Sequence, residues 1–176
     1  MDLVQMLANA VNNVTAVGIQ LVLALGAVGG LVMLALHFGN IASKARRGQV
    51  QDGAGKILSV VVVCGCIIAL HQVMNATSQQ MALGNVTFGA IAYVSEGKYG
   101  PAAVAINAGL TLLQWVGVIY AFQGLLRLRR SQKDGHTGLS AGEDVTSGVK
   151  RIIVGTMLAV SPRVLDALQN TLNIHW

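Results

Sequence analysis

The sequence predicts an all-α integral membrane protein, with about four transmembrane helices arranged as two antiparallel hairpins that bend at basic cytoplasmic loops. Of its 176 residues 53% are hydrophobic and 11% are charged, and the mean hydropathy is +0.61. Soluble domains carry about a quarter charged residues. Long apolar runs alternate with two basic segments. We expect a first hairpin over residues 1–74, an outer-face connection over 75–100 and a second hairpin over 101–176.

The first hairpin begins with residues 1–16, whose apolar positions recur every three or four residues. This spacing predicts a short amphipathic helix on the outer membrane surface, continuous with a first span over 17–38. The span carries no charge and is long enough for the ~30 Å hydrocarbon core. Within it, Gly26, Gly29 and Gly30 are small enough to let another helix approach closely, and we expect them to pack against one.

Most of the positive charge lies in two segments that follow apolar runs. Short loops rich in Lys and Arg stay on the cytoplasmic side of a membrane, so both bends are expected to face the cytoplasm and both termini to face outward. The net charge of +5 is therefore a sign of topology and not of sequence-specific nucleic-acid binding. Six residues define the two bends, namely Lys44, Arg46, Arg47, Arg127, Arg129 and Arg130.

The second span is expected over residues 57–74, and the connection that follows contains the moderately apolar stretch 86–94. Nine residues are too few to cross a bilayer as a helix, and one strand cannot satisfy its backbone in lipid. We therefore predict an interfacial or re-entrant helix there.

The third span, 102–122, carries Asn107, Thr111 and Gln114 at spacings that place them on one helical face. The favoured interpretation is a stripe that faces other protein, and the alternative is a pore lining. The fourth span begins at Val149 and is interrupted at Pro162. Arg163 and Asp166 stand three residues apart there, where they can form a buried ion pair.

No pattern in the chain predicts catalysis. The four histidines are scattered, paired carboxylates are missing, and Cys64 and Cys66 are interpreted as small helix-packing residues. We expect no enzymatic activity, no metal and no cofactor. The two halves share a parallel plan, for which duplication is the favoured explanation and convergent topology is the alternative.

A hairpin of small-residue-rich helices around a basic bend resembles the pilins of conjugative type IV secretion systems. The whole pattern, two such hairpins with Gly26, Gly29 and Gly30 in the first helix and basic bends at 44–47 and 127–130, resembles the TraQ proteins of IncI-type conjugation. It is also similar to their IcmC/DotE relatives in type IVB secretion. The chain departs from ordinary pilins in its doubled length and in its lack of a recognisable cleaved leader.

The resemblance implies a non-enzymatic structural subunit in a bacterial inner membrane, either channel-associated or part of an extracellular filament. Its implied partners are membrane lipids, other copies of itself and other secretion subunits. The six basic residues of the bends would contact phospholipid head groups, with bound phospholipid as the implied ligand. The competing hypothesis is a small transporter or channel built from two parallel hairpin repeats.

Overall fold

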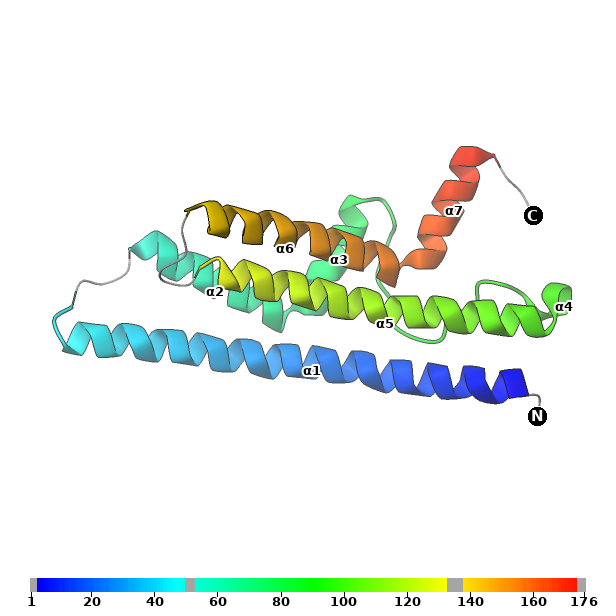
Figure 1. Cartoon of the computed structure of the whole chain (residues 1–176), viewed down its shortest axis with the longest axis horizontal. Helices are drawn as coiled ribbons and strands as arrows, with labels where there is room; N and C mark the ends of the chain where they lie inside the picture. Colours follow the sequence, from blue (N-terminus) through cyan, green and yellow to red (C-terminus); the bar gives the residue numbers. More distant parts are fainter. Residues whose placement is uncertain (1–2, 50–52, 133–137, 174–176) are drawn as a thin grey trace.

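The computed structural model describes residues 3–49, 53–132 and 138–173, and these residues contain helices and connecting segments but no strand. The fold class is therefore all-α, as predicted. In Figure 1 the long helices lie alongside one another, and shorter ones run across them. The helices are α1 (Leu3–Arg46), α2 (Ala54–Ile68), α3 (Leu70–Gln80), α4 (Glu96–Tyr99), α5 (Pro101–Arg130), α6 (Gly138–Ala159) and α7 (Ser161–Leu172).

Helix α1 is one unbroken helix of 44 residues. The predicted surface helix, the first span and the start of the first basic bend all belong to it, because no proline interrupts the sequence. Lys44 and Arg46 lie in its last turn, where positive charge is favourable beside the helix dipole. The first basic bend, placed at 44–47 by the sequence, therefore begins inside α1.

Helices α5 and α6 run antiparallel and touch at the level of their backbones (Figure 1). A Cβ atom added at Gly117 would lie 2.5 Å from the carbonyl oxygen of Gly155, and one at Gly124 would lie 2.7 Å from that of Gly148. The two contacting glycines of each helix are seven residues apart, so the two contacts lie about two helical turns apart on matching faces. Only glycine permits this approach.

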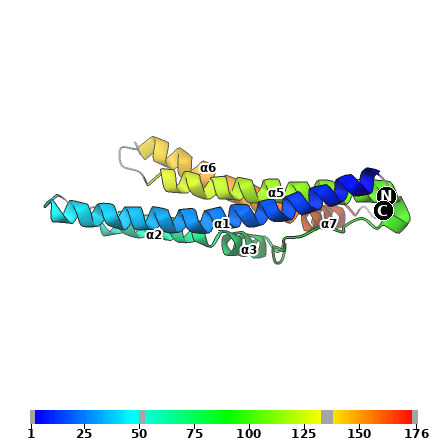
Figure 2. The same cartoon turned by 90° about the horizontal axis from the view of Figure 1, so that it is seen from below.

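Helix α1 lies between α2 on one side and α5 on the other (Figure 2). A Cβ atom added at Gly30 would meet Ile68 at 2.6 Å, and one at Gly26 would meet the carbonyl oxygen of Ile67 at 3.3 Å. These two glycines lie against α2 of the same chain. Gly29 has no atom within 4 Å of such a Cβ and faces away.

Each half of the chain contains a sharply bent helix pair. Helix α3 turns by 90° from α2, and α7 turns by 84° from α6. The backbone has nearly the same angles at both breaks, with φ −98° and ψ 35° at Ala69 and φ −108° and ψ 30° at Val160. Among the described residues, two helices are long and apolar enough to cross a membrane, or up to four if each bent pair is one span. Such helices indicate a membrane protein, but the second and fourth spans are not straight.

The apolar runs of α1 and α5 are offset along the molecule. The Cβ position of Gly18 lies 2.8 Å from the ring of Trp115. Gly18 is at the start of the 17–38 run, whereas Trp115 is well past the middle of the 102–122 run. A shift of twelve residues corresponds to about 18 Å at ~1.5 Å per residue. The two predicted spans therefore share less than half of a ~30 Å hydrocarbon layer.

Residues 83–95 are extended along α5, so the predicted helix over 86–94 is wrong. Polar side chains of α5 bind the backbone of this segment. Asn107 Oδ1 accepts from the N–H groups of Tyr93 and Val94 at 3.0 and 2.9 Å, and Asn107 Nδ2 donates to Val94 O at 2.9 Å. Thr111 Oγ1 accepts from the N–H of Ile91 at 3.1 Å.

Gln114 completes this set of contacts. Its Oε1 accepts from the N–H of Gly89 at 3.3 Å, and its Nε2 donates to Thr87 O at 2.6 Å and to Ala159 O, at the end of α6, at 3.4 Å. The polar stripe of α5 faces protein, as predicted, but its main partner is an extended segment. Alternate residues of the segment can meet successive turns of α5, because two extended residues advance about 6.6 Å and one helical turn advances about 5.4 Å.

The close contact between α5 and α6 predicts the effect of Gly155→Ala. The added Cβ would lie 2.6 Å from Ala121 N and from Gly117 O, which are backbone atoms that cannot rotate away. We expect a loss of about 1–3 kcal/mol in the free energy of unfolding, measured by thermal unfolding in detergent micelles. The control is Gly109→Ala in α5, which meets nothing within 4 Å. It should be neutral or stabilising, and equal effects of both changes would contradict this packing.

The bonds to the extended segment predict the effect of Asn107→Leu. The substitution leaves the N–H groups of Tyr93 and Val94 without their acceptor, at a cost of about 1–3 kcal/mol. Amide hydrogen exchange at these residues should accelerate by about tenfold or more. Gln123→Leu is the matched control, since Gln123 accepts from Arg151 at 2.9 Å, away from the segment. Unchanged exchange in the Asn107 variant would show that the segment is held by other contacts.

Candidate functional site

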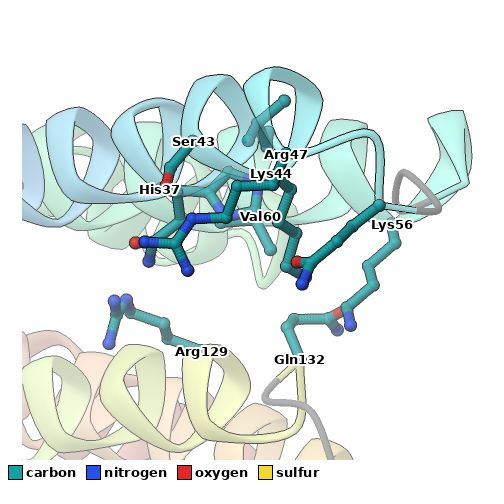
Figure 3. Close-up of a pocket in the computed structure, with 11 residues that line it drawn as sticks. His37, Ser43, Lys44, Arg47, Lys56, Val60, Arg129 and Gln132 are labelled. Atoms are coloured by element: carbon teal, nitrogen blue, oxygen red, sulfur yellow. The ribbon is translucent and has the colours of Figure 1, made fainter.

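A basic cavity of about 380 Å³ lies between α1, α2 and α5 (Figure 3). The end of α1 provides most of its wall, the start of α2 provides a second side, and the end of α5 closes the third. Figure 3 shows Arg129 of α5 pointing into the space towards α1, whereas Gln132, which follows α5, points towards Lys56 of α2. The lining residues are His37, Asn40, Ile41, Ser43, Lys44, Arg47, Gln49, Lys56, Val60, Arg129 and Gln132.

A hydrogen bond between the two halves of the chain holds the walls of the cavity together. Ser59 Oγ in α2 donates to Gln132 Oε1 at 2.7 Å and is shared with the carbonyl oxygen of Lys56 at 3.0 Å. Val60, one residue further along α2, is buried and forms part of the wall. The cavity is therefore made by the packing of one half of the chain against the other.

The three arginines that end α5 point in different directions. Arg129 lines the cavity. Arg127 donates to Ser147 Oγ at 2.8 Å, and Arg130 lies 3.8 Å from Asp144, so both contact α6. The helical rotation of about 100° per residue separates position 129 from the other two. We assigned all three arginines to one basic bend from the sequence, although the helical period alone places Arg129 on a different face from Arg127 and Arg130.

The first basic bend is divided in the same way. Lys44 and Arg47 line the cavity, whereas Arg46 does not. Lys56 of α2 joins the lining from the far side of the bend, although it was not among the predicted site residues. Among the described lining residues, four are cationic, from α1, the turn that follows it, α2 and α5, and none of these described residues is acidic.

Two nitrogen atoms at the cavity are buried without a hydrogen-bond partner in the described part of the chain. They are His37 Nε2 and Arg129 Nε. A buried donor that lacks a partner costs about 1–3 kcal/mol, and more when it is charged. The described lining is therefore rich in cationic side chains and in polar groups that can donate hydrogen bonds.

Arg163 and Asp166 lie towards the other end of the molecule and do not pair with each other among the described contacts. Arg163 Nη1 donates to the carbonyl oxygens of Leu83, at 2.9 Å, and Asn85. Asp166 Oδ1 accepts from the hydroxyl of Tyr93 at 2.9 Å. Burial, and then this carboxylate, raise the pKa of Tyr93. Both residues thus bind the extended segment, in place of the predicted ion pair.

The described residues contain no group of three or more His, Cys, Asp or Glu side chains that could hold a metal ion. Cys64 and Cys66 are free thiols in α2, with Cys64 fully buried in the helix packing. Comparisons with protein-family models, with curated proteins and with solved structures find no match for the chain.

Proposed function

We propose that this protein is a non-enzymatic structural subunit of a conjugative or type IV secretion apparatus, working in a bacterial inner membrane as part of a larger assembly. The observation that carries the proposal is the offset between the apolar runs of α1 and α5. Because of this offset, any placement of a single copy in a bilayer leaves either a charged side chain in lipid or large apolar side chains in water. Two placements of the membrane illustrate the conflict.

The first placement centres the bilayer on residues 17–38 of α1. Gly26 then lies near the middle of the membrane, and the ring of Phe122 in α5 lies 3.4 Å from its Cβ position. Gly148 opposes Gly124, so Lys150 of the antiparallel α6 lies near the level of Phe122. Lys150 is exposed. An ammonium group at this depth is costly in lipid and requires protein or an aqueous lumen beside it.

The second placement centres the bilayer on residues 102–122 of α5. The residues of α1 after Gly26 then leave the hydrocarbon layer. Val28 is 61% exposed and Leu36 is 62% exposed, and other large apolar side chains follow the same face. An apolar surface of this length in water marks an interaction site. Each placement therefore requires a partner, and copies of the chain are the partner that a repetitive assembly supplies.

The arrangement of the ends supports the expected orientation. The start of α1 and the end of α7 lie towards one end of the molecule, and the basic cavity lies towards the other (Figures 1 and 3). With the basic end in the cytoplasm, or at the lumen of a filament, both termini face outward. The resemblance to TraQ-type and pilin-like proteins supports a place in a transfer machine, with head groups of lipids near the basic bends.

A small transporter remains the second candidate. Matched breaks at Ala69 and Val160 favour it, since many transporters bind their substrates at broken helices in repeated halves. The polar stripe of α5 argues against it, because Asn107, Thr111 and Gln114 bind the backbone of residues 87–94. These groups are therefore engaged within the chain. The proposal of a structural subunit explains more of the exposed apolar surface than the proposal of a transporter does.

Electron microscopy of shed surface material and of detergent-extracted inner membranes, with mass spectrometry of both, tests this proposal. We expect the chain as a major component of a filament, or in a large inner-membrane complex with other secretion subunits. The variant Gly29→Leu tests contacts with other molecules. This glycine faces away from its own chain, so a leucine side chain there would disturb only a contact with another molecule. A protein that is extracted only as a single copy and conducts a solute in liposomes would favour the transporter.

A further inference from the structure

We propose that a cavity between the start of α1 and the extended segment binds an extended stretch of another polypeptide, which adds as a strand to the free edge of the segment. The cavity has a volume of about 310 Å³ and is lined by α1, by residues 90–92 and by α5. It lies towards the end of the molecule where α1 begins, away from the basic cavity (Figure 1). The inference goes beyond the proposed function and does not depend on it, because it concerns a different site and a peptide ligand.

One edge of the extended segment is paired and the other is free. Successive residues of an extended chain turn their N–H and C=O groups to opposite sides. The N–H groups of Gly89, Ile91 and Tyr93 bind side chains of α5 at 3.3, 3.1 and 3.0 Å. The backbone groups of Ala90 and Ala92, which alternate with them, make no hydrogen bond among the described contacts, and both residues are exposed. An unpaired extended edge is a template for a further strand.

Helix α1 presents a stripe of amide side chains to the same cavity. Gln5, Asn9 and Asn12 line it and follow one another at i, i+4 and i+7. The stripe of α5 that binds the paired edge of the segment has the same spacing. Amide side chains supply both donors and acceptors, so a stripe at this spacing can serve an extended backbone from one face. Helix α1 can thus hold a second strand in the way that α5 holds the first.

An unsatisfied atom marks the α1 wall of the cavity. Asn12 Oδ1 is buried without a hydrogen-bond partner in the described part of the chain. A buried acceptor without a donor is unfavourable, and an N–H group of a bound chain would satisfy it. Thr15 lies about one turn further along the same face. It is 1% exposed, and its Oγ1 also lacks a partner among the described residues. This face of α1 therefore carries polar groups that the chain itself does not use.

The lining defines the chemistry of the guest chain. None of its described residues is charged, and Ala8, Ala90, Ala92 and Ala108 keep its walls small. Its volume is at the lower end of the range for ligand sites, which suits a short stretch of backbone. A helix cannot use the free edge, because its own N–H and C=O groups are already paired. The ligand that fits is an extended segment with small, uncharged side chains and no proline at the pairing positions.

The guest has to offer two free edges, one to the backbone of Ala90 and Ala92 and one to the amides of α1. The extended segment of a second copy offers only one, because its other edge is bound to its own α5. A different polypeptide is therefore the occupant. Its strand would lie between the segment and α1, and it would extend the hydrogen-bonded layer that α5 begins.

Two double variants separate the cavity from the rest of α1. Asn9→Ala with Asn12→Ala removes two amides from the lining, and Asn13→Ala with Gln20→Ala removes two amides outside it. None of the four side chains makes a hydrogen bond among the described contacts, so both proteins should fold like the wild type. Ala92→Pro is a third variant, which removes an N–H of the free edge and no bond within the chain. Circular dichroism and gel filtration check all three.

The binding assay uses full-length protein in a neutral detergent and the blocked pentapeptide acetyl-Thr-Val-Ala-Val-Thr-amide. Its control is the same peptide with N-methyl groups on both valines, which keeps the side chains and removes two donors. Amide hydrogen exchange at Ala90 and Ala92 is the readout across a peptide titration. We expect exchange in the wild type to slow by about tenfold or more at saturation. The Asn9 and Asn12 variant should bind about tenfold more weakly, the outer control within about threefold, and Ala92→Pro more weakly than the wild type.

The outcomes decide between a peptide edge and other occupants. No protection of Ala90 and Ala92 by the pentapeptide, or equal protection by its N-methylated form, would overturn the inference. Equal losses in the two double variants would do the same, and so would protection by sucrose but not by the peptide, which would assign the cavity to a polar solute. If the variants do not fold, the comparison of the two peptides on the wild type still decides. The assay contains no secretion apparatus, so its result is separate from that of the proposed function.

Discussion

The backbone contact between α5 and α6 determines where the other polar groups of this protein lie. Four glycines bring the helices so close that a methyl group would collide with a carbonyl oxygen. The contact fixes α6 lengthwise against α5, which brings the carbonyl of Ala159 to Gln114 and starts α7 beside the extended segment. In a membrane protein, where apolar side chains gain little by leaving lipid, such close packing is a principal source of helix association.

The extended segment shows how a membrane protein can contain an irregular backbone. Residues 87–94 cannot satisfy their own N–H and C=O groups, and α5 supplies the missing donors and acceptors from one face. Arg163 of α7 likewise donates hydrogen bonds to the carbonyl oxygens of Leu83 and Asn85. Polar residues of α5 that look like a pore lining in the sequence are therefore engaged with the backbone of the chain itself.

The sequence was sufficient for features that depend on composition and helical period, and insufficient for those that depend on distant contacts. The all-α class, the apolar runs of α1 and α5, and the protein-facing stripe at Asn107 followed from residue type and spacing. The extended conformation of 83–95 did not, because its hydrogen-bond partners come later in the chain. The offset of the two apolar runs depends on how Gly18 meets Trp115, which no local pattern records. The helical period alone could have distinguished Arg129 from Arg127 and Arg130. The burial of its Nε atom could not be predicted from the sequence.

The unbroken length of α1 has a mechanical consequence. At about 1.5 Å per residue its 44 residues form a rod of about 66 Å, more than twice the thickness of the hydrocarbon core. One end reaches a small polar cavity beside Asn107, and the other forms the wall of the basic cavity. A rod without a hinge acts as a lever, so a tilt imposed at the end near Asn107 would appear as a displacement of Lys44 and Arg47. The two sides of the membrane are thereby joined by a single stiff element.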